Sequence, residues 1–516
     1  MATHANMRVN SSIVICRRRL MTTKSRQLMH GPGGFRQASG EGSSMVENRP
    51  YFPELIVDLH DESTVINAAN VILSCVGGIK AGTIDTRSDI RNTTTAKVSI
   101  VSGGLTNALF RVDINDEEKQ PSSVLVRIFG AEGMIDRDTE TANFARLCDS
   151  KGSAVHSQLD YLGRFGNGRI ETLIPNMRAA TICDFKENEE LVLEVIRQMA
   201  RLHYGFDIPE YLIDRDSISS CGGDGGGEGE SDCRQLQPVL WDVLASWNNE
   251  LVTKISQACS RDLRLVVIFC SALFGDTHIV AEDGDGINES ALTEMMAQIA
   301  QILNRETQWI QDHVIEHHPD APIAFCHNDI NAANILINVG LDSGDGNGCD
   351  RDSVAMIDYE YGALNYTQYD IANFICEHCG GNDNGIPDYN LMPTLELQRK
   401  LVHEYIQERD RVLNNSKRHV DEQKEVAKLL SQVQTFQMVS HLYWGTWGIL
   451  QGVTELLEGK YEIDKVKSRL YNKMDVDSWD NLRYGKSRLN QYRKHKQSIL
   501  ETGQKQMSYL YHSGRL

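Results

Sequence analysis

Three polar residues between positions 325 and 358 have the types and the spacing that phosphoryl transfer needs. Asp329 lies in the segment FCHND, Asn334 follows five residues later, and Asp358 directly follows the apolar run VAMI. A carboxylate at position 329 is free to act as a general base. The oxygens of Asn334 and Asp358 are ligands that Mg²⁺ takes together with water and nucleotide phosphates. The segment therefore predicts a phosphotransferase centre with Asp329 as the catalytic residue and the other two as metal ligands.

Two short apolar segments are expected to hold these residues in place. ILIN at 335–338 leaves the loop as one strand, and VAMI at 354–357 forms a second. The Gly/Asp/Asn-rich residues 340–353 predict a hairpin connection that carries a solvated insertion. Two such strands side by side would deliver Asn334 and Asp358 to the same end. The alternative is a loop in which Asp and Asn only cap turns.

The spacing resembles the catalytic loop of protein kinases, in which an Asp is followed five residues later by an Asn, and then by a strand pair and a metal-binding Asp. Here HND, which ends at Asp329, replaces His-Arg-Asp, and DYE, which begins at Asp358, replaces Asp-Phe-Gly. The Arg that would receive an activation-loop phosphate is absent, and no Ala-Pro-Glu follows. A small-molecule kinase fits this segment better than a protein kinase.

Length and composition indicate a globular enzyme larger than one ordinary domain. The chain has 516 residues, of which 41% are hydrophobic, and a formal net charge of −19. That charge argues against a general nucleic-acid binder, because it would repel a phosphate backbone, and it suits a cationic substrate. The twelve cysteines lack the spacing of a disulfide scaffold, and no apolar run approaches the roughly 20 residues that span a bilayer. We expect free thiols, no transmembrane segment and a cytoplasmic location.

Both termini are basic and are predicted to be extensions. Residues 1–45 contain no acidic residue before Glu41, and we expect this stretch to be disordered; an organelle-targeting peptide is the alternative. Residues 475–516 form the second extension, whose part from Asn481 onward holds eight Lys or Arg against one Glu. We expect it to be solvated, and contact with an anionic membrane is the alternative.

A nucleotide-binding N-lobe is predicted over residues 46–178. The sequence KVSIVSGGLTNALFRVDI at 97–114 indicates a strand, a glycine-containing turn and a second strand. Exposed amides at such a turn can bind the phosphates of ATP, although the alternative is a turn without a ligand. The candidate ATP-binding residues here are Gly103, Gly104, Thr106 and Asn107.

The next predicted strand, SVLVRIFG at 123–130, carries Arg127 within an apolar run, where a charge needs a partner. Glu140, in the predicted helix DRDTETANFARL, is the candidate partner. A strand cation paired with a helix glutamate holds the α and β phosphates in kinase-type folds. The alternative is a surface salt bridge that stabilises little.

A mainly helical C-lobe is predicted over residues 179–474. ELVLEVIRQMARLHYGF at 190–206 has apolar residues at helical spacing, and two amphipathic segments follow beyond residue 237. Residues 219–233, SSCGGDGGGEGESDC, cannot bury enough apolar surface to offset their ordering entropy. They predict a disordered insertion.

Several segments together resemble the choline/ethanolamine kinase family over residues 51–474. The stretch IDYEYGALNYTQYDIANFICEHCGG at 357–381, the FCHND segment and the WGTW within 434–452 are highly specific, and GGLTN, VLVRIFG and GRFGNGRIETLIP add to them. The resemblance implies an α+β, protein-kinase-like two-lobed fold with a small β-rich N-lobe and a larger, mainly helical C-lobe.

The resemblance also implies ATP-dependent phosphorylation of an amino alcohol's hydroxyl, with Mg²⁺ as cofactor, Asp329 as base and Asn334 and Asp358 on the metal. Trp444 and Trp447 would share one helix face and, with Tyr361, would wall a substrate ammonium. The alternative for these rings is core packing. Glu377 matches an acidic position of the family near the amine, and its alternative is a solvated helix residue.

Residues 378–381 decide which amino alcohol the resemblance favours. Choline kinases tend to carry further aromatic residues just after the glutamate, whereas this chain has His-Cys-Gly-Gly. That run is similar to the ethanolamine kinase branch, whose substrate has three N–H donors. The implied product is phosphoethanolamine, in the first step of phosphatidylethanolamine synthesis by the CDP-ethanolamine route. A choline kinase or a dual choline/ethanolamine kinase stays open, because INAAN at 330–334 matches neither branch well.

Two further functions and one oligomeric state also stay open. A catalytically inactive pseudokinase would be favoured by loss of a catalytic or phosphate-binding residue, and these are intact. A kinase of the aminoglycoside-phosphotransferase type would act on a larger polyol, which the aromatic set and the acidic surface do not favour. A homodimer is an assembly that the sequence allows.

Overall fold

The structure is a computed structural model, and the described residues lie in one compact unit, Gly40–Leu516. The structure describes residues 49–76, 96–101, 107–114, 123–130, 136–150, 156–209, 212, 236–262, 264–265, 269, 273, 289–339, 353–381, 384–414, 421–460 and 479–512. The predicted N-terminal extension, the insertion at 219–233 and the turn residues Gly103, Gly104 and Thr106 lie outside them.

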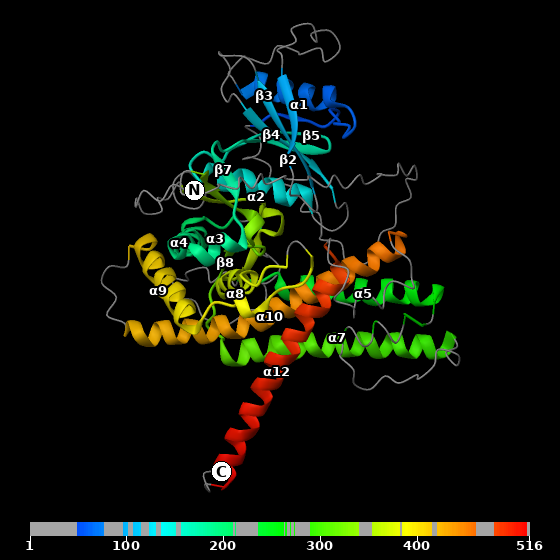
Figure 1. The fold of residues 1–516 in the computed structure, drawn as a ribbon, viewed down its shortest axis with the longest axis vertical. Helices are drawn as coiled ribbons and strands as arrows, with labels where there is room; N and C mark the ends of the chain where they lie inside the picture. The colour runs from blue at the N-terminus through cyan, green and yellow to red at the C-terminus, as the bar shows by residue number, and fades with distance from the viewer. Residues whose placement is uncertain are drawn as a thin grey trace, which may run out of the picture. The chain divides into compact units, whose positions relative to one another are not determined.

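A six-stranded sheet forms the N-terminal part of the described fold (Figure 1). Its strands are β1 (Tyr51–Phe52), β2 (Ala96–Val101), β3 (Asn107–Ile114), β4 (Ser123–Phe129), β5 (Tyr161–Phe165) and β6 (Gly168–Thr172), and the helices α1 (Glu62–Val76) and α2 (Arg137–Asp149) accompany them. The order is β1-β5-β6-β4-β3-β2, and all neighbours are antiparallel except β1 and β5. The two strands predicted within 97–114 are confirmed as β2 and β3.

Side chains alternate between the two faces of the sheet along β4 and β6, so the apolar and the charged side chains lie on opposite faces. Val126 and Ile128 of β4 and Ile170 of β6 pack in the apolar cluster that includes α1. Arg127 and Arg169 lie between these apolar residues and opposite each other in the ladder, so their side chains leave the other face of the sheet. The sheet thus presents an apolar face to α1 and a charged face away from it.

The rest of the described chain is mainly helical, as expected. Its helices are α3 (Ile182–Glu187), α4 (Glu189–Gly205), α5 (Leu240–Arg261), α7 (Glu289–His317), α8 (Thr367–Glu377), α9 (Leu395–Val412), α10 (Glu422–Leu457) and α12 (Asn481–His512). Two small sheets, β10-β9-β7 and β11-β8, are made by β7 (Met177–Ala179), β8 (Ile323–Cys326), β9 (Ile335–Asn338), β10 (Val354–Met356) and β11 (Ala363–Tyr366). Helix α10 is central among the helices, since it packs against α5, α8, α9 and α12 (Figure 1).

Helix α12 crosses α10 at very short range. A Cβ atom placed on Gly448 of α10 would lie 2.7 Å from the Cα of Gly485 of α12. A Cβ on Gly445 would meet the side chain of Leu489 at 2.8 Å. Only residues without a side chain allow two helix backbones to approach this closely. The crossing therefore depends on glycines on both helices.

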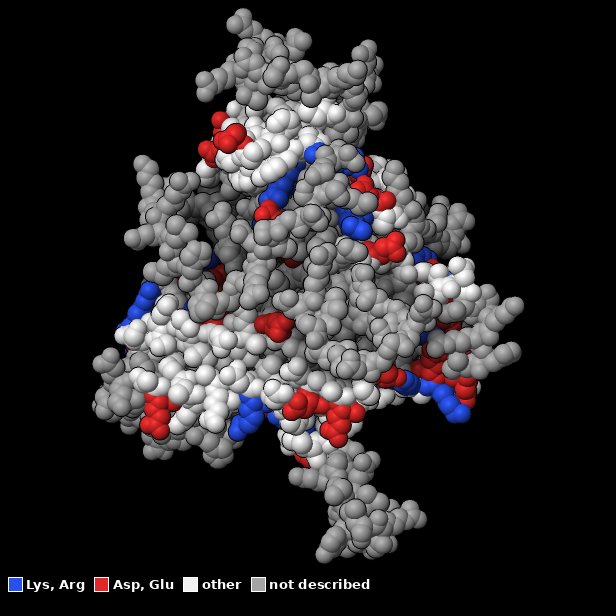
Figure 2. Space-filling model, turned by 180° about the vertical axis from the view of Figure 1, so that it is seen from behind, with Lys and Arg blue, Asp and Glu red and all other residues white. Residues whose placement is uncertain are grey.

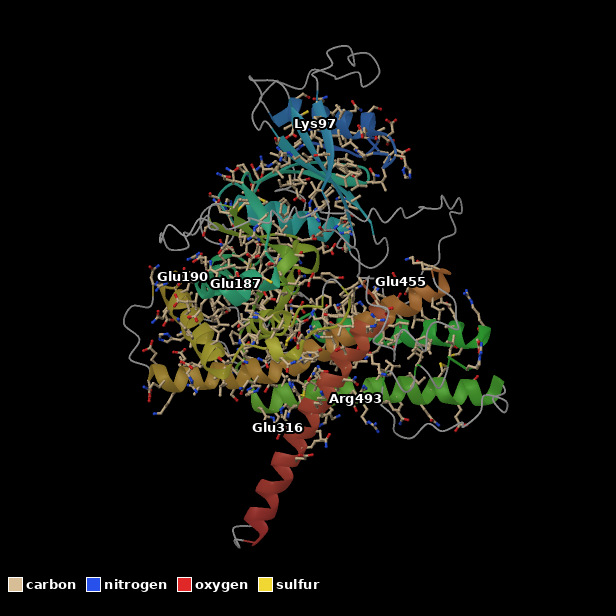
Figure 3. The ribbon with its side chains drawn as sticks, in the orientation of Figure 1. Lys97, Glu187, Glu190, Glu316, Glu455 and Arg493 are labelled. Atoms are coloured by element: carbon tan, nitrogen blue, oxygen red, sulfur yellow. The ribbon has the colours of Figure 1, made fainter. Side chains whose placement is uncertain are left out.

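The predicted solvated extension over residues 475–516 is wrong for residues 479–496. Leu482 and Leu489 of α12 are buried. Lys496 donates to Glu306 of α7 at 2.5 Å, and Arg493, labelled in Figure 3, donates to the main-chain carbonyl of Leu273 at 2.5 Å. The many basic residues of this segment obscured its apolar positions, and several of those basic side chains bind the protein itself.

The described surface carries charges of both signs. On the face in Figure 2, acidic and basic side chains lie among one another. Within the described ranges, no helix is both long and apolar enough to cross a membrane. The seven described cysteines carry free thiols, as expected.

Candidate active site

The loop after β8 brings Asp329 and Asn334 into contact. The Nδ2 atom of Asn334 donates to Oδ2 of Asp329 at 3.0 Å and to its main-chain carbonyl at 2.9 Å. Asn331 donates to the other carboxylate oxygen at 3.1 Å, and a 3-10 turn, η5 (Ala332–Asn334), closes the loop. Because Nδ2 of Asn334 is committed to Asp329, its Oδ1 is the atom left for another partner.

The paired strands β9 and β10 deliver Asn334 and Asp358 to the same end of a hairpin, as predicted. The main-chain amide of Ile357 donates to the carbonyl of Asn334 at 3.0 Å. Asp358 follows with a φ of 64°, and Asn328 has a φ of 66°. Non-glycine residues rarely adopt this left-handed conformation, and such strain gathers at functional sites.

A buried carboxylate that the sequence analysis missed, Asp370 of α8, fixes the loop from behind. Its oxygens accept hydrogen bonds from the main-chain amides of His327 at 2.7 Å and Asn328 at 2.8 Å. Nε2 of His203 lies 3.1 Å from the same carboxylate. The signal in the sequence was an aspartate within the apolar segment YDIANFIC, where an unpaired charge would be costly.

His327 links this loop to the strand that precedes Asp358. Its Nε2 donates to the carbonyl of Ile357 at 2.8 Å, and its Nδ1 accepts from the main-chain amide of Asp329 at 3.3 Å. Burial lowers the pKa of His327, which agrees with a neutral ring that donates at one nitrogen and accepts at the other. The neutral His327 side chain therefore joins the loop that carries Asp329 to the strand that precedes Asp358.

Asp329 lies in a cluster of negative charge. Burial, and then the charges of Glu377, Glu360 and Asp358, hold its pKa well above the usual range, against the hydrogen bond from Asn331. A carboxylate with a raised pKa is a better proton acceptor once it is ionised. A cation bound nearby would favour that ionised form.

Arg127 is held by two acidic residues, and neither is the predicted Glu140. Its Nε donates to Glu171 at 2.9 Å and its Nη1 donates to Asp358 at 2.8 Å. The predicted direct pair of Arg127 with Glu140 is therefore wrong. Glu171 lies on the adjacent strand β6, on the same face as Arg127, so a neighbour in the sheet provides the carboxylate instead of the helix.

Glu140 belongs to the same network, one step further on. It accepts from Arg169 at 2.7 Å and from Arg137 at 2.6 Å, and Arg137 also donates to Glu360 at 3.2 Å. The predicted Asn107 donates to Glu360 at 3.1 Å. Charges alternate along Asp358, Arg127, Glu171, Arg169, Glu140, Arg137 and Glu360. We call these seven residues the charge ring, because it begins and ends within the DYE segment.

The three predicted aromatic residues lie in contact, and a fourth joins them. Ring centroids are 5.5 Å apart for Tyr361 and Trp444 and 5.6 Å apart for Trp444 and Trp447. Tyr484 of α12 lies 6.5 Å from Trp447. The sequence analysis missed Tyr484 because it assigned that segment to an extension. We call these four residues the aromatic corner.

The aromatic corner borders the acidic loop. Burial, and then the charges of Glu360 and Asp329, raise the pKa of Tyr361. The main-chain carbonyl of Tyr361 accepts a hydrogen bond from Nδ2 of Asn328, the residue before Asp329, at 2.9 Å. The same rings also pack with the large apolar core, which contains Trp444.

Glu377 is buried, so the alternative of a solvated helix residue is wrong. Its Oε1 accepts a hydrogen bond from Nη1 of Arg488, on α12, at 2.7 Å. Burial raises the pKa of Glu377, and the charge of Arg488 opposes that shift. Arg488 is another residue of this region that the sequence analysis missed.

The chain is similar in sequence to several known proteins. The sequence profile described as choline/ethanolamine kinase matches residues 98–493, which includes the first part of α12. Human ethanolamine kinase 2 is 32% identical over 392 residues, which cover 75% of this chain and 73% of that protein. Probable choline kinase 2 of Arabidopsis thaliana is 25% identical over 410 residues, which cover 78% of this chain and 87% of that protein. The similar proteins thus include both acceptor types.

Two solved structures have a similar fold. The choline kinase of Cryptosporidium parvum covers 84% of this chain and 97% of its own, with a TM-score of 0.51 and 19% identity. The ethanolamine kinase of Plasmodium vivax covers 84% of this chain and 89% of its own, with the same TM-score and identity. These matches confirm the protein-kinase-like, two-lobed fold that the sequence predicts.

Proposed function

The chain belongs to the choline/ethanolamine kinase family, and on that premise we propose that it transfers the terminal phosphoryl group of ATP to the hydroxyl of ethanolamine. The observation that carries the proposal is the contact of Asp329 with Asn334 at 3.0 Å, beside Asp358 at the end of the neighbouring strand. The product would be phosphoethanolamine, the first intermediate of phosphatidylethanolamine synthesis by the CDP-ethanolamine route.

In this proposal Asp329 accepts the proton of the acceptor's hydroxyl. The hydroxyl oxygen forms the new bond to phosphorus, the bond between that phosphorus and the ADP oxygen breaks, and the proton passes to the Asp329 carboxylate. Most of the remaining catalysis is positioning and charge neutralisation. The negative cluster around Asp329 suits both tasks, because it attracts cations and keeps the carboxylate basic.

The residues present fit Mg²⁺. Asn334 keeps its Oδ1, because Nδ2 is engaged by Asp329, and Asp358 keeps its Oδ2, because Oδ1 accepts from Arg127. Both are hard oxygen donors at the end of one hairpin, which is the donor chemistry that Mg²⁺ prefers beside nucleotide phosphates. When bound, Mg²⁺ would neutralise charge on the phosphates. Asn334 and Asp358 would hold it.

The N-lobe residues would serve the nucleotide. Arg127 is buried on the charged face of the sheet and already contacts Asp358, so it lies where phosphate and metal would meet. Asn107 and Glu140 reach the same region through Glu360 and the charge ring. We assign Gly103, Gly104 and Thr106 to the phosphates as well, on the strength of the sequence pattern.

The acceptor's ammonium would lie between the aromatic corner and Glu377. Aromatic faces attract a cation, and one carboxylate complements its charge. Ethanolamine is preferred over choline in this proposal because the turn after Glu377 presents no additional ring. His378 instead packs between Phe185 and Phe374, with centroids 5.0 and 4.8 Å away, and its Nδ1 donates to the carbonyl of Phe374. An ammonium with three N–H donors gains more from acceptors than from a complete aromatic cage.

An ATP-consumption assay of the purified chain with Mg²⁺ tests the proposal, with ethanolamine, choline or no acceptor. We expect turnover with ethanolamine well above that with choline, and a loss of about 10²–10⁴-fold in Asp329→Asn. Asp312→Asn, at an exposed position of α7, is the matched control and should keep full activity. Preference for choline would overturn the acceptor assignment alone, whereas no acceptor-dependent turnover would overturn the proposed activity.

A further inference from the structure

Arg488 is an arginine buried beside the proposed acceptor site. It is 1% exposed, and it lies on α12, 111 residues beyond Glu377 in the chain. Its Nη1 donates to Glu377 at 2.7 Å and to the hydroxyl of Tyr484 at 3.3 Å. Burying a guanidinium costs free energy unless the group is paired. The buried position of Arg488 therefore depends on these partners.

A second set of hydrogen bonds leads from Arg488 to the catalytic loop. Its Nη2 donates to the hydroxyl of Ser440 at 2.7 Å, and that hydroxyl donates to Oδ1 of Asn373 at 2.9 Å. Nδ2 of Asn373 donates to the main-chain carbonyl of Ile330 at 3.4 Å. Ile330 directly follows Asp329. The path thus crosses α12, α10 and α8 and ends one residue from the proposed base.

Glu377 and Asp329 form the other connection between Arg488 and the loop. The charge of Glu377 is the largest cause, after burial, of the raised pKa of Asp329. Arg488 reaches this connection through its hydrogen bond to Glu377. Without Arg488, the buried Glu377 would lose its charged hydrogen-bond partner, and its protonated form would be favoured.

The titratable groups around Arg488 and Glu377 include five that are neutral near pH 7. They are Cys376 and Cys379 of α8 and its following turn, Tyr389, His441 of α10, and Tyr484 of α12. Burial raises the pKa values of both thiols and both tyrosines and lowers the pKa of His441. The charged groups here are therefore Arg488 and Glu377, with Asp329 and its other acidic neighbours, Glu360 and Asp358, on the side of the loop.

We propose that Arg488 is a positioning residue for the acceptor site: it keeps Glu377 ionised for the acceptor's ammonium and ties α12 to the catalytic loop. This inference rests on the proposed function, because it takes Glu377 as the group that meets the ammonium. Arg488 itself donates all its described hydrogen bonds to the protein. It acts on the acceptor through Glu377 and through the aromatic corner, to which Tyr484 belongs.

The test is the Michaelis constant for ethanolamine, measured from pH 6.5 to 8.5 in the full-length chain and in Arg488→Met. We expect the KM of the variant to rise by about tenfold or more at pH 6.5 and to fall as pH rises, because Glu377 loses its proton in that direction. The KM for ATP should change by less than about threefold, because the N-lobe is untouched. Arg488→Lys keeps the positive charge, so its KM for ethanolamine should lie close to that of the wild type.

The matched control is Arg493→Met, one turn and a half further along α12, which lies outside the site and should leave both constants unchanged (Figure 3). If Arg488→Met unfolds, the double variant Arg488→Met/Glu377→Gln provides the test, because it removes the carboxylate left without a partner. It should melt at a higher temperature than Arg488→Met. Its KM for ethanolamine should stay above that of the wild type at every pH. An Arg488→Met enzyme with an unchanged acceptor KM and pH profile would overturn the inference. Absence of acceptor turnover in the wild-type chain would instead overturn the proposed function.

Discussion

Arg127 and Arg169 lie opposite each other on β4 and β6, and both donate to the same oxygen of Glu171, at 2.9 and 2.6 Å. Two like charges in register on adjacent strands destabilise a sheet unless a counter-charge separates them. Glu171 supplies that counter-charge on the charged face. One carboxylate oxygen therefore holds the two arginines from which the rest of the charge ring extends.

Replacing Glu171 with Gln should lower both stability and activity. The substitution leaves two buried guanidinium groups facing each other, and we expect a loss of about 3–5 kcal/mol in the free energy of unfolding. Chemical denaturation measures it. Glu190→Gln is the matched control, since Glu190 pairs with Arg197 at an exposed position (Figure 3) and should cost less than about 1 kcal/mol. Equal losses in the two variants would contradict the role assigned to the ring.

Asp370→Asn should release the loop that carries Asp329. The carboxylate accepts two main-chain N–H bonds, and an amide side chain has only one acceptor oxygen, so one of the two donors would be left unpaired. We expect a loss of about 1–3 kcal/mol in the free energy of unfolding. The kcat should fall by at least about tenfold while the KM for ATP changes little, because the substitution displaces the proposed base, Asp329, and leaves the N-lobe intact. Steady-state kinetics at several ATP concentrations separate these effects, and an unchanged kcat would rule out the anchoring role.

The protein should lose stability in mild acid through His378. Burial lowers the pKa of this ring from 6.5 to about 4 in the folded state. The unfolded chain therefore binds the proton more tightly, so the stabilisation is complete above pH 6.5 and is lost as pH falls toward 4. The loss for this residue alone is about 3 kcal/mol.

His378→Gln, which cannot take up a proton in this range, tests the assignment. Its free energy of unfolding should be lower than that of the wild type at pH 7, and the difference should shrink by pH 4.5. Urea titrations at the two pH values measure it. A difference that stays constant with pH would show that His378 does not contribute to acid sensitivity.

Gly448→Val should separate α12 from α10. The new Cβ would meet the backbone of Gly485 at 2.7 Å, and backbone cannot move aside as a side-chain end can. We expect a loss of about 1–3 kcal/mol in stability and a higher KM for the acceptor, because Tyr484 and Arg488 move with α12. Gly459→Ala is the comparison: its Cβ meets open space, and its φ of 73° should cost only about 1 kcal/mol. Similar acceptor KM values in both variants would contradict the link between the crossing and the site.

The loop that carries Asp329, the β9–β10 hairpin and the tryptophan pair could be predicted from the sequence, because each depends on local spacing. Asp329 and Asn334 are five residues apart, and Trp444 and Trp447 share a helix face, so short-range geometry determines both contacts. The partner of Arg127 could not be predicted in the same way. Both Glu140 and Glu171 carry the right charge, and the choice between them depends on which strand lies beside β4.

The role of α12 was hidden for a different reason. Its basic residues suggest a solvated segment, whereas Leu482 and Leu489, exactly one heptad apart, mark the buried face. Arg488 looks like any other exposed cation until its partner Glu377 is seen to be buried. Pairing between distant charged residues leaves no mark on local sequence periodicity.

The distance in sequence between Glu377 and Arg488 also sets an order of events during protein synthesis. At about 5–20 residues per second, a ribosome needs roughly 5–20 s to add the 111 positions that separate them. During that interval the nascent chain already contains Asp329, Asn334 and Asp358. A chain truncated before α12 would contain the whole proposed phosphoryl-transfer loop and would lack the part of the proposed acceptor site that α12 supplies.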